Sequence, residues 1–175
     1  MAMISGFLSK LLTGRQASFS EENISIFELL FAMQPVKSIV GFQRDLERTY
    51  KDEGRDMMIG LGRNISDEII GHFKKKFKME RSQLKNTWSN MFSLGGFGKL
   101  QLVKFGPHAA IVQTESSAIA KIYLNEFGRQ KNPVCLIICG MLESYFKELT
   151  GKKAKCKETT CMANGNRYCT FEVSF

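Results

Sequence analysis

The sequence predicts an α+β protein in which an antiparallel sheet packs with helices. Three observations lead to this prediction. Apolar residues recur at helical spacing over residues 36–88, two stretches alternate with a period of two (residues 100–114 and 153–175), and one helical segment separates those stretches. Helices followed by strands, a further helix and a final hairpin are typical of this fold class.

The length and composition describe one ordinary domain covering residues 1–175. Hydrophobic residues make up 43% of the chain and charged residues 24%, which excludes a disordered or fibrous protein. The longest apolar stretch, Val134–Leu142, has nine residues, whereas a helix needs about 20 to span a bilayer. We therefore expect no transmembrane segment. The amino terminus lacks the pattern of a secretory signal, so we expect a cytoplasmic protein.

Basic residues outnumber acidic ones by 25 to 17, and the net charge is +8. A basic protein can bind nucleic acid, an anionic membrane surface or an acidic partner. The basic residues are scattered here, with local clusters only at residues 74–78 and 152–157. We interpret the charge as a lysine-rich surface, and nucleic-acid binding is not expected.

The amino-terminal segment is predicted to form a short helix and one or two short strands. Residues 4–12 place five apolar side chains on one helical face, and Gly14 ends that helix. Such a face fits packing in the core better than docking on a membrane or a partner. Ile24 and Ile26 alternate with polar neighbours, which indicates strand structure within residues 19–31.

Helical periodicity dominates the next fifty residues. One helix over residues 36–50 is expected to have its C-cap at Gly54, and another carries apolar residues from Met58 to Phe73. A more polar third helix covers about residues 80–91. Three glycines of the second helix are expected to let a neighbouring helix approach closely: Gly60, Gly62 and Gly71.

Two strands and two further helical segments follow. Residues 100–105 and 110–114 alternate between apolar and polar side chains, and Gly106-Pro107-His108 connects them as a hairpin. Residues 116–127 form a short helix or a loop. A helix over residues 134–149 starts after Pro133 and is closed by Gly151.

The carboxy-terminal segment predicts a hairpin. In residues 153–158 three lysines occupy one face of a strand, and Ala154, Cys156 and Glu158 occupy the other. In residues 168–175 an apolar face containing Cys169 and three large side chains alternates with polar residues. Residues 163–166 supply the turn.

Cysteine is confined to this end of the chain, because all five cysteines lie in the last 41 residues. Cys161 and Cys169 flank the turn and can meet, and Glu158 points to the inner face, where a carboxylate needs a partner. Zn²⁺ accepts thiolate and carboxylate ligands and takes four of them in closed sites. The preceding helix offers Cys135 or Cys139 as the fourth ligand. The alternative is a set of free cysteines in the core.

The same segment resembles the 4-vinyl-reductase-type, or hydrocarbon-binding, domain. The motifs that carry the resemblance are Asn132-Pro133-Val134-Cys135, Gly140-Met141-Leu142-Glu143, Leu149-Thr150-Gly151-Lys152-Lys153, Glu158-Thr159-Thr160-Cys161, and Gly165 with Cys169-Thr170-Phe171-Glu172-Val173. The resemblance is firmest over residues 132–175. It reaches back to about Gly95 through Gly96-Phe97-Gly98-Lys99-Leu100 and is weaker over residues 1–94.

The resemblance implies a fold, a metal and an assembly state. The family resembles the helix-and-antiparallel-sheet fold of vesicle-tethering (TRAPP) subunits and haem-based nitric oxide sensors, commonly as a homodimer. In aromatic-compound sensors of this family a structural zinc lies near an apolar ligand cavity. The family's ligand pattern falls here on Cys135, Glu158, Cys161 and Cys169. Cys139 and Cys156 lie outside the pattern and are interpreted as small buried residues.

No catalytic constellation is recognised. The two histidines, His72 and His108, fall on a helix and in a turn, away from any serine–aspartate pattern. No nicotinamide or flavin motif is present, so the vinyl reduction that the family name suggests is not expected. Six aromatic residues are candidates for the wall of a ligand pocket: Trp88, Phe92, Phe97, Phe105, Tyr123 and Phe127.

These observations predict a non-enzymatic domain that binds a small apolar molecule and is braced by structural zinc. The family's sensors join this domain to an ATPase and a DNA-binding region that this sequence lacks, so a signal would pass through a homodimer or a separate partner protein. An assembly or tethering subunit is the alternative from a different class. Tetrapyrrole binding is a further alternative.

Overall fold

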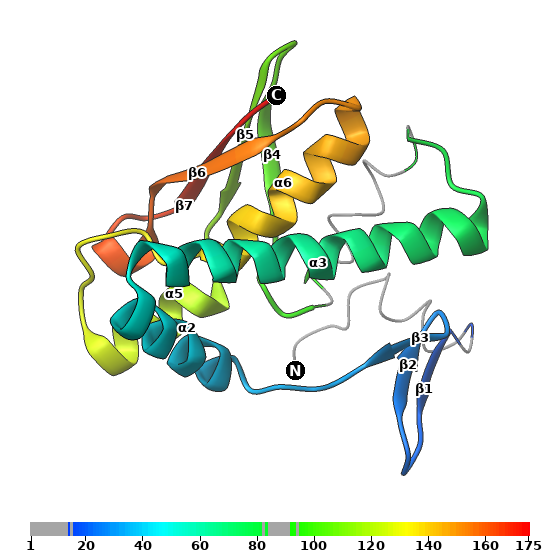
Figure 1. Ribbon diagram of the computed structural model, residues 1–175, viewed down its shortest axis with the longest axis horizontal. Helices are drawn as coiled ribbons and strands as arrows, with labels where there is room; N and C mark the ends of the chain where they lie inside the picture. Colours follow the sequence, from blue (N-terminus) through cyan, green and yellow to red (C-terminus); the bar gives the residue numbers. More distant parts are fainter. Residues whose placement is uncertain (1–13, 15, 82, 84–91, 94) are drawn as a thin grey trace. The chain divides into compact units, whose positions relative to one another are not determined.

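The fold is that of a computed structural model, which describes residue 14, residues 16–81, residue 83, residues 92–93 and residues 95–175. The chain divides into two compact units, residues 1–35 and residues 36–175 (Figure 1). The helix expected at residues 4–12 lies outside the described residues, as does most of the one expected at residues 80–91. The prediction of a single domain stays a prediction.

The first unit contains a small antiparallel sheet of three strands: β1 (Ala17–Phe19), β2 (Ile24–Ile26) and β3 (Leu29–Phe31). The sequence predicted one or two strands in this segment. The third strand arises from a two-residue turn, since Ile26 pairs with Leu29 across Phe27 and Glu28. Both turn residues have positive φ, 54° and 70°, which matches the right-handed twist of a hairpin.

The second unit begins with two helices, α2 (Val36–Tyr50) and α3 (Asp52–Phe77). The expected C-cap at Gly54 is wrong. The chain reverses earlier, at Lys51, whose φ is +54°, and Gly54 lies buried inside α3. A Cβ atom at position 54 would overlap the carbonyl oxygen of Leu46. That glycine therefore allows α2 and α3 to approach closely.

An antiparallel sheet of four strands follows, in the order β4-β5-β7-β6. The strands are β4 (Gln101–Phe105), β5 (Ala109–Thr114), β6 (Lys155–Thr160) and β7 (Cys169–Ser174). The predicted hairpin faces are confirmed, because Glu158 and Cys169 are buried while Lys155 and Lys157 are exposed. The confirmed fold class is therefore α+β.

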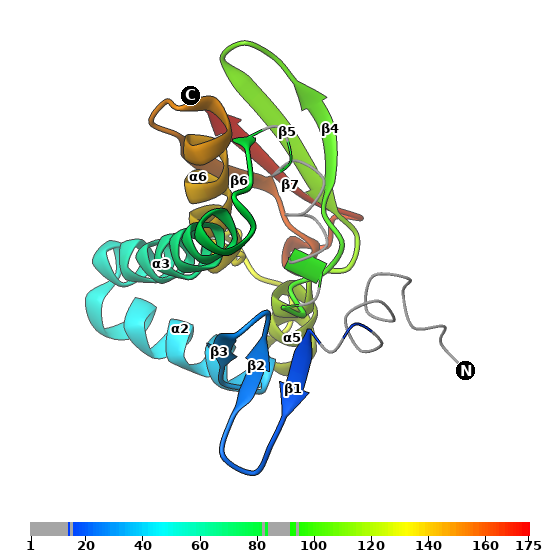
Figure 2. The same cartoon turned by 90° about the vertical axis from the view of Figure 1, so that its right-hand side faces the viewer.

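Helix α6 (Leu136–Thr150) forms the centre of this unit. It contacts β6 and β7 on one side and α3 on the other (Figure 2). Its crossing with α3 is close because Gly62 and Gly140 face the opposing backbone. A Cβ atom at Gly62 would overlap the Ile137 carbonyl, and one at Gly140 would overlap the Ile59 carbonyl.

The expectation of a close approach is thus confirmed for one of the three glycines named from the sequence. Gly62 makes the crossing. A Cβ at Gly60 would meet only the Arg63 guanidinium, at 3.7 Å, and one at Gly71 would meet open space. These two glycines lie on the helix surface away from α6 because a helix buries only one stripe of its residues.

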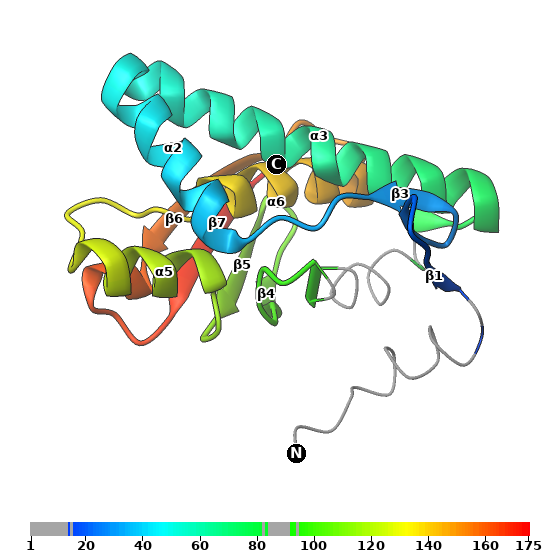
Figure 3. The same cartoon turned by 90° about the horizontal axis from the view of Figure 1, so that it is seen from below.

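The segment expected as a helix or a loop contains helix α5 (Ala118–Phe127). It contacts α2 and the short 3-10 helix η1 (Met162–Asn164) in the hairpin turn, and Figure 3 shows these parts at the same end of the unit. The start of α5, the start of α6 and the turn between β6 and β7 therefore lie together at this end, where all four ligands predicted from the sequence are found.

Candidate metal centre

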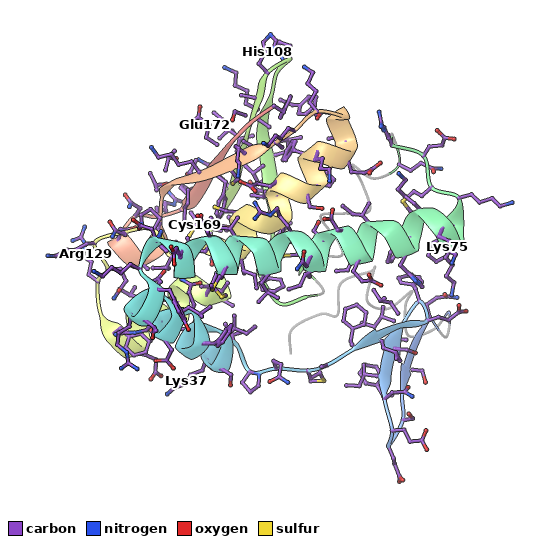
Figure 4. The ribbon with its side chains drawn as sticks, viewed as in Figure 1. Lys37, Lys75, His108, Arg129, Cys169 and Glu172 are labelled. Atoms are coloured by element: carbon purple, nitrogen blue, oxygen red, sulfur yellow. The ribbon has the colours of Figure 1, made fainter. Side chains whose placement is uncertain are left out.

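Four element ends bring the sequence-predicted ligands together. Cys135 is the N-cap residue of α6, and Glu158 lies on the inner face of β6. Cys161 precedes η1, and Cys169 begins β7, where Figure 4 labels it at the turn end of the sheet. All four residues are buried, and the three cysteines have no exposed surface.

The spacing of the four ligand atoms suits one small cation. The three Sγ atoms and one carboxylate oxygen all lie within 4.8 Å of one another. The Sγ atom of Cys169 is 3.7 Å from that of Cys135 and 3.9 Å from that of Cys161. A tetrahedral ion with metal–sulfur bonds of about 2.3 Å separates its sulfurs by about 3.8 Å. These distances exceed the disulfide bond of about 2.05 Å, and all three cysteines are free.

The Glu158 carboxylate has one satisfied and one unsatisfied oxygen. Its Oε2 atom accepts a hydrogen bond of 2.8 Å from the Cys135 backbone N–H. Its Oε1 atom is buried and has no hydrogen-bond partner among the described residues. A buried carboxylate oxygen without a partner is costly. A cation among the three sulfurs would satisfy this oxygen, so the residues present fit a metal ion.

Hydrogen-bond donors surround the sulfur atoms. The Met162 N–H donates to the Sγ of Cys169 at 3.3 Å, and the Ser117 hydroxyl lies 3.3 Å from the Sγ of Cys135. Both are neutral groups. Outer hydrogen bonds of this kind orient metal ligands and moderate the charge of a thiolate.

Burial and mutual hydrogen bonding shift the pKa values of this cluster in opposite directions. Burial raises the pKa of the Glu158 carboxyl to about 8, with the Cys161 thiolate adding to the shift. Burial also raises the pKa of the Cys135 thiol. Hydrogen bonds from the Cys135 and Cys169 thiols lower the pKa of Cys161. One sulfur therefore carries the negative charge in the metal-free protein, and its neighbours retain their protons.

The two remaining cysteines lie outside this group of four ligand atoms. Cys139 is buried one turn further along α6, and Cys156 is half-buried on β6. Burial and the neighbouring Cys139 raise the pKa of the Cys156 thiol well above its usual value. Of the two candidates for the fourth ligand, Cys135 is the one that lies beside Glu158, Cys161 and Cys169.

The candidate pocket residues lie in three separate ring contacts. Phe92 contacts Phe97 with ring centroids 5.5 Å apart, and Tyr123 contacts Phe127 at 6.0 Å. Phe105 instead packs with two other rings, those of Phe146 and Phe175. Trp88 lies outside the described residues. The pocket wall stays a prediction.

The two histidines lie far from the four ligands in the sequence and on other elements. His108 is at the tip of the connection between β4 and β5 (Figure 4). His72 is on α3 and contacts the ring of Phe73. Within the described residues, no helix is both long enough and apolar enough to cross a bilayer.

Two residues that contact the site were not found as such from the sequence. Gln43 of α2 is fully buried and donates to the Val134 carbonyl oxygen, directly before Cys135. Ser117 contacts the Cys135 sulfur. The spacing of Ser117 before an apolar helical run is an N-cap signal, whereas nothing in the sequence pairs Gln43 with a residue 91 positions away.

An antiparallel sheet packed with helices and a buried cysteine–glutamate cluster define the class of this protein. Solved structures share the fold. The phenol-responsive sensory domain of the transcription activator PoxR, crystallised with phenol, has a TM-score of 0.78 at 14% identity. That likeness covers 98% of this chain and 91% of the other.

Two further structures are less similar. A trafficking protein particle complex subunit 3 from Naegleria fowleri, covalently bound to palmitic acid, has a TM-score of 0.52 at 12% identity, over 79% of this chain and 93% of that chain. A vinyl-4-reductase family protein from Methanocaldococcus jannaschii has a TM-score of 0.43 at 17% identity, over 82% and 96%. No curated protein sequence matches the chain.

The family model of the vinyl-4-reductase domain matches residues 117–175. This segment holds all four candidate ligands, α5, α6 and the closing hairpin. The resemblance to the 4-vinyl-reductase-type domain, drawn from the motifs of the same segment, is confirmed.

Proposed function

We propose that this chain is a ligand-binding sensor domain in which Cys135, Glu158, Cys161 and Cys169 hold one structural Zn²⁺. The observation that carries the metal assignment is the convergence of four buried ligand atoms, including the partnerless Oε1 of Glu158. Thiolate and carboxylate are ordinary zinc ligands, and four of them close the coordination shell. A closed shell leaves no position for activating water, which supports a structural role.

Zinc at this position would cross-link parts of the chain that are distant in sequence. It would tie the start of α6 to β6 and β7. Such sites contribute on the order of 10 kcal/mol to folding in small domains. The zinc would therefore hold the end of the sheet against the central helix.

A small apolar molecule is the ligand we propose. The shared fold with a phenol-responsive sensory domain and the match to the vinyl-4-reductase domain model support this function. The six aromatic candidates named from the sequence, Trp88 among them, are proposed as the pocket wall. A signal would pass through a homodimer or a separate partner protein, and we propose no catalytic residue. The free cysteines support a location in the cytoplasm.

Native mass spectrometry combined with elemental analysis tests the metal. We expect one zinc per chain in the wild type and loss of zinc from the double variant Cys161→Ser/Cys169→Ser. Cys156→Ser is the matched control, since it removes a thiol of the same hairpin outside the cluster, and it should keep its zinc. Zinc retained by the double variant would overturn the assignment.

The same spectra test the ligand. A small aromatic or other apolar molecule that co-purifies and is released on denaturation supports sensing. A thermal-shift series with phenol, alkylphenols and benzene should raise the melting temperature for at least one compound. A co-purifying long acyl chain with no response to small aromatics would instead favour the tethering alternative. Absence of both would contradict the proposed ligand class.

A further inference from the structure

Ser117 connects a helix cap to the candidate metal centre. It is the N-cap residue of α5, with φ −60° and ψ 113°, and its hydroxyl oxygen accepts the Ala120 N–H at 3.2 Å. The same oxygen lies 3.3 Å from the Sγ of Cys135. Both Ser117 and Cys135 have no exposed surface, so water does not compete for either contact.

The direction of the hydrogen bond follows from the chemistry of the two groups. A serine hydroxyl has one hydrogen to donate and two lone pairs. One lone pair of Ser117 accepts the Ala120 N–H. A metal-ligating cysteine is a thiolate and has no hydrogen to donate. The hydroxyl hydrogen of Ser117 must therefore point to the Cys135 sulfur when that sulfur is a ligand.

Ser117 differs in kind from the other donors around the cluster. The hydrogen bonds to Cys169 and to Glu158 come from the backbone N–H groups of Met162 and Cys135. A backbone donor survives almost any substitution, whereas a side-chain hydroxyl does not. Ser117 is thus a point at which one residue sets the environment of one ligand.

We infer that Ser117 is a positioning residue for the metal centre, donating a hydrogen bond that orients the Cys135 thiolate and reduces its charge. This inference rests on the proposed zinc site. Substituting outer-shell partners of metal ligands lowers affinity by roughly 10- to 100-fold. Because Ser117 also starts α5, the same hydroxyl links the state of the metal to the first turn of that helix.

Four variants separate this role from helix capping. Ser117→Ala removes the cap and the sulfur contact together. Ser117→Gly removes the hydroxyl but keeps most of the capping preference, and Ser117→Thr keeps both. Ser116→Ala is the matched control, because the Ser116 hydroxyl accepts from the Lys99 N–H at 3.0 Å and lies next in sequence.

The measurement is the absorption spectrum of the cobalt(II)-loaded protein together with zinc affinity from chelator competition. Loss of a hydrogen bond raises the energy of the sulfur lone pair, so the thiolate-to-cobalt band should move to longer wavelength in Ser117→Ala and Ser117→Gly. Zinc affinity should fall roughly 10- to 100-fold in both. Ser117→Thr and Ser116→Ala should match the wild type in band position and affinity.

The outcomes distinguish this inference from the proposed function. A wild-type protein that binds neither cobalt nor zinc contradicts the metal site itself. A wild type that binds both, with an unchanged band and affinity in Ser117→Gly, overturns the role of Ser117 and leaves the site intact. If Ser117→Ala fails to fold, Ser117→Gly and Ser117→Thr still decide the question.

Discussion

The side-chain amide of Gln43 donates a hydrogen bond of 3.0 Å to the carbonyl oxygen of Val134, the residue before Cys135. Arg55 reaches the neighbouring Pro133 carbonyl at 3.1 Å. Two helices from the first half of the second unit thus hold the backbone that enters α6. The position of Cys135 depends on side chains that lie far away in sequence.

We expect Gln43→Ala to destabilise the protein by about 1–3 kcal/mol, because a buried carbonyl would lose its donor. Chemical denaturation should show a lower midpoint with an unchanged m-value. Gln113→Ala is a suitable control, since Gln113 is half-buried and its amide pairs with the Thr170 hydroxyl. That variant should lose about 1 kcal/mol or less. Equal losses would argue against the special role of Gln43.

The crossing of α3 and α6 predicts opposite effects for two glycine substitutions. Gly140→Ala should cost about 3 kcal/mol or more, because its Cβ would overlap the Ile59 backbone, which cannot move aside. Gly71→Ala, on the exposed side of α3 where a Cβ meets open space, should stabilise the protein by about 0.5–1 kcal/mol. Thermal unfolding measures both, and a tolerated alanine at position 140 would contradict the close crossing.

The Glu158 carboxyl predicts a pH dependence in the metal-free protein. Its pKa is raised to about 8 from an ordinary value of 4.5, mainly by burial. Between these values the folded state binds a proton that the unfolded state has lost, so this contribution is fully present below pH 4.5 and is lost as pH rises through 8. The stability of the wild type relative to Glu158→Gln should therefore fall over this window.

The difference between the two proteins is the quantity to measure, by urea denaturation in the presence of a chelator. It cancels most of the opposite contribution from Cys161, whose pKa is lowered by the neighbouring thiols. Each unit of pKa difference corresponds to about 1.4 kcal/mol. A difference that stays constant from about pH 5 to 8 would show that Glu158 is ionised in the metal-free fold.

Zinc uptake should release protons at neutral pH. Burial raises the pKa of the Cys135 thiol and of the Glu158 carboxyl, so both hold protons before the metal binds. Ligands must be deprotonated to coordinate. Calorimetric titrations of zinc in buffers of different ionisation enthalpy should therefore give different apparent enthalpies. Cys156→Ser should release as many protons as the wild type, and buffer-independent heats would contradict this charge distribution.

The closing hairpin shows how far local patterns predict this structure. Alternation alone placed Glu158 and Cys169 on the buried face and Lys155 and Lys157 outside, because side chains of a strand change sides at every residue. The helix that carries Cys135 and its closure at Gly151 were predicted from Pro and Gly signals, and Gly151 has the left-handed conformation of a C-cap. The ligand cluster was thus accessible from the sequence.

Gly54 shows where such reasoning fails. A glycine after a helical run looks like a C-cap, yet the chain turns at Lys51 and Gly54 serves the packing of α2 against α3. The sequence cannot distinguish a glycine that ends a helix from one that admits a neighbouring backbone. Only the position of the partner helix decides between them.

The sequence by itself determined the fold class, the carboxy-terminal hairpin and three candidate ligands, since these follow from periodicity and from residues close along the chain. The tertiary structure alone decided that Cys135 rather than Cys139 lies beside Glu158, and that Gln43 and Ser117 support the entry to α6. The physical reason is range. Alternation and capping act over a few residues, whereas these contacts depend on how helices distant in sequence pack against one another.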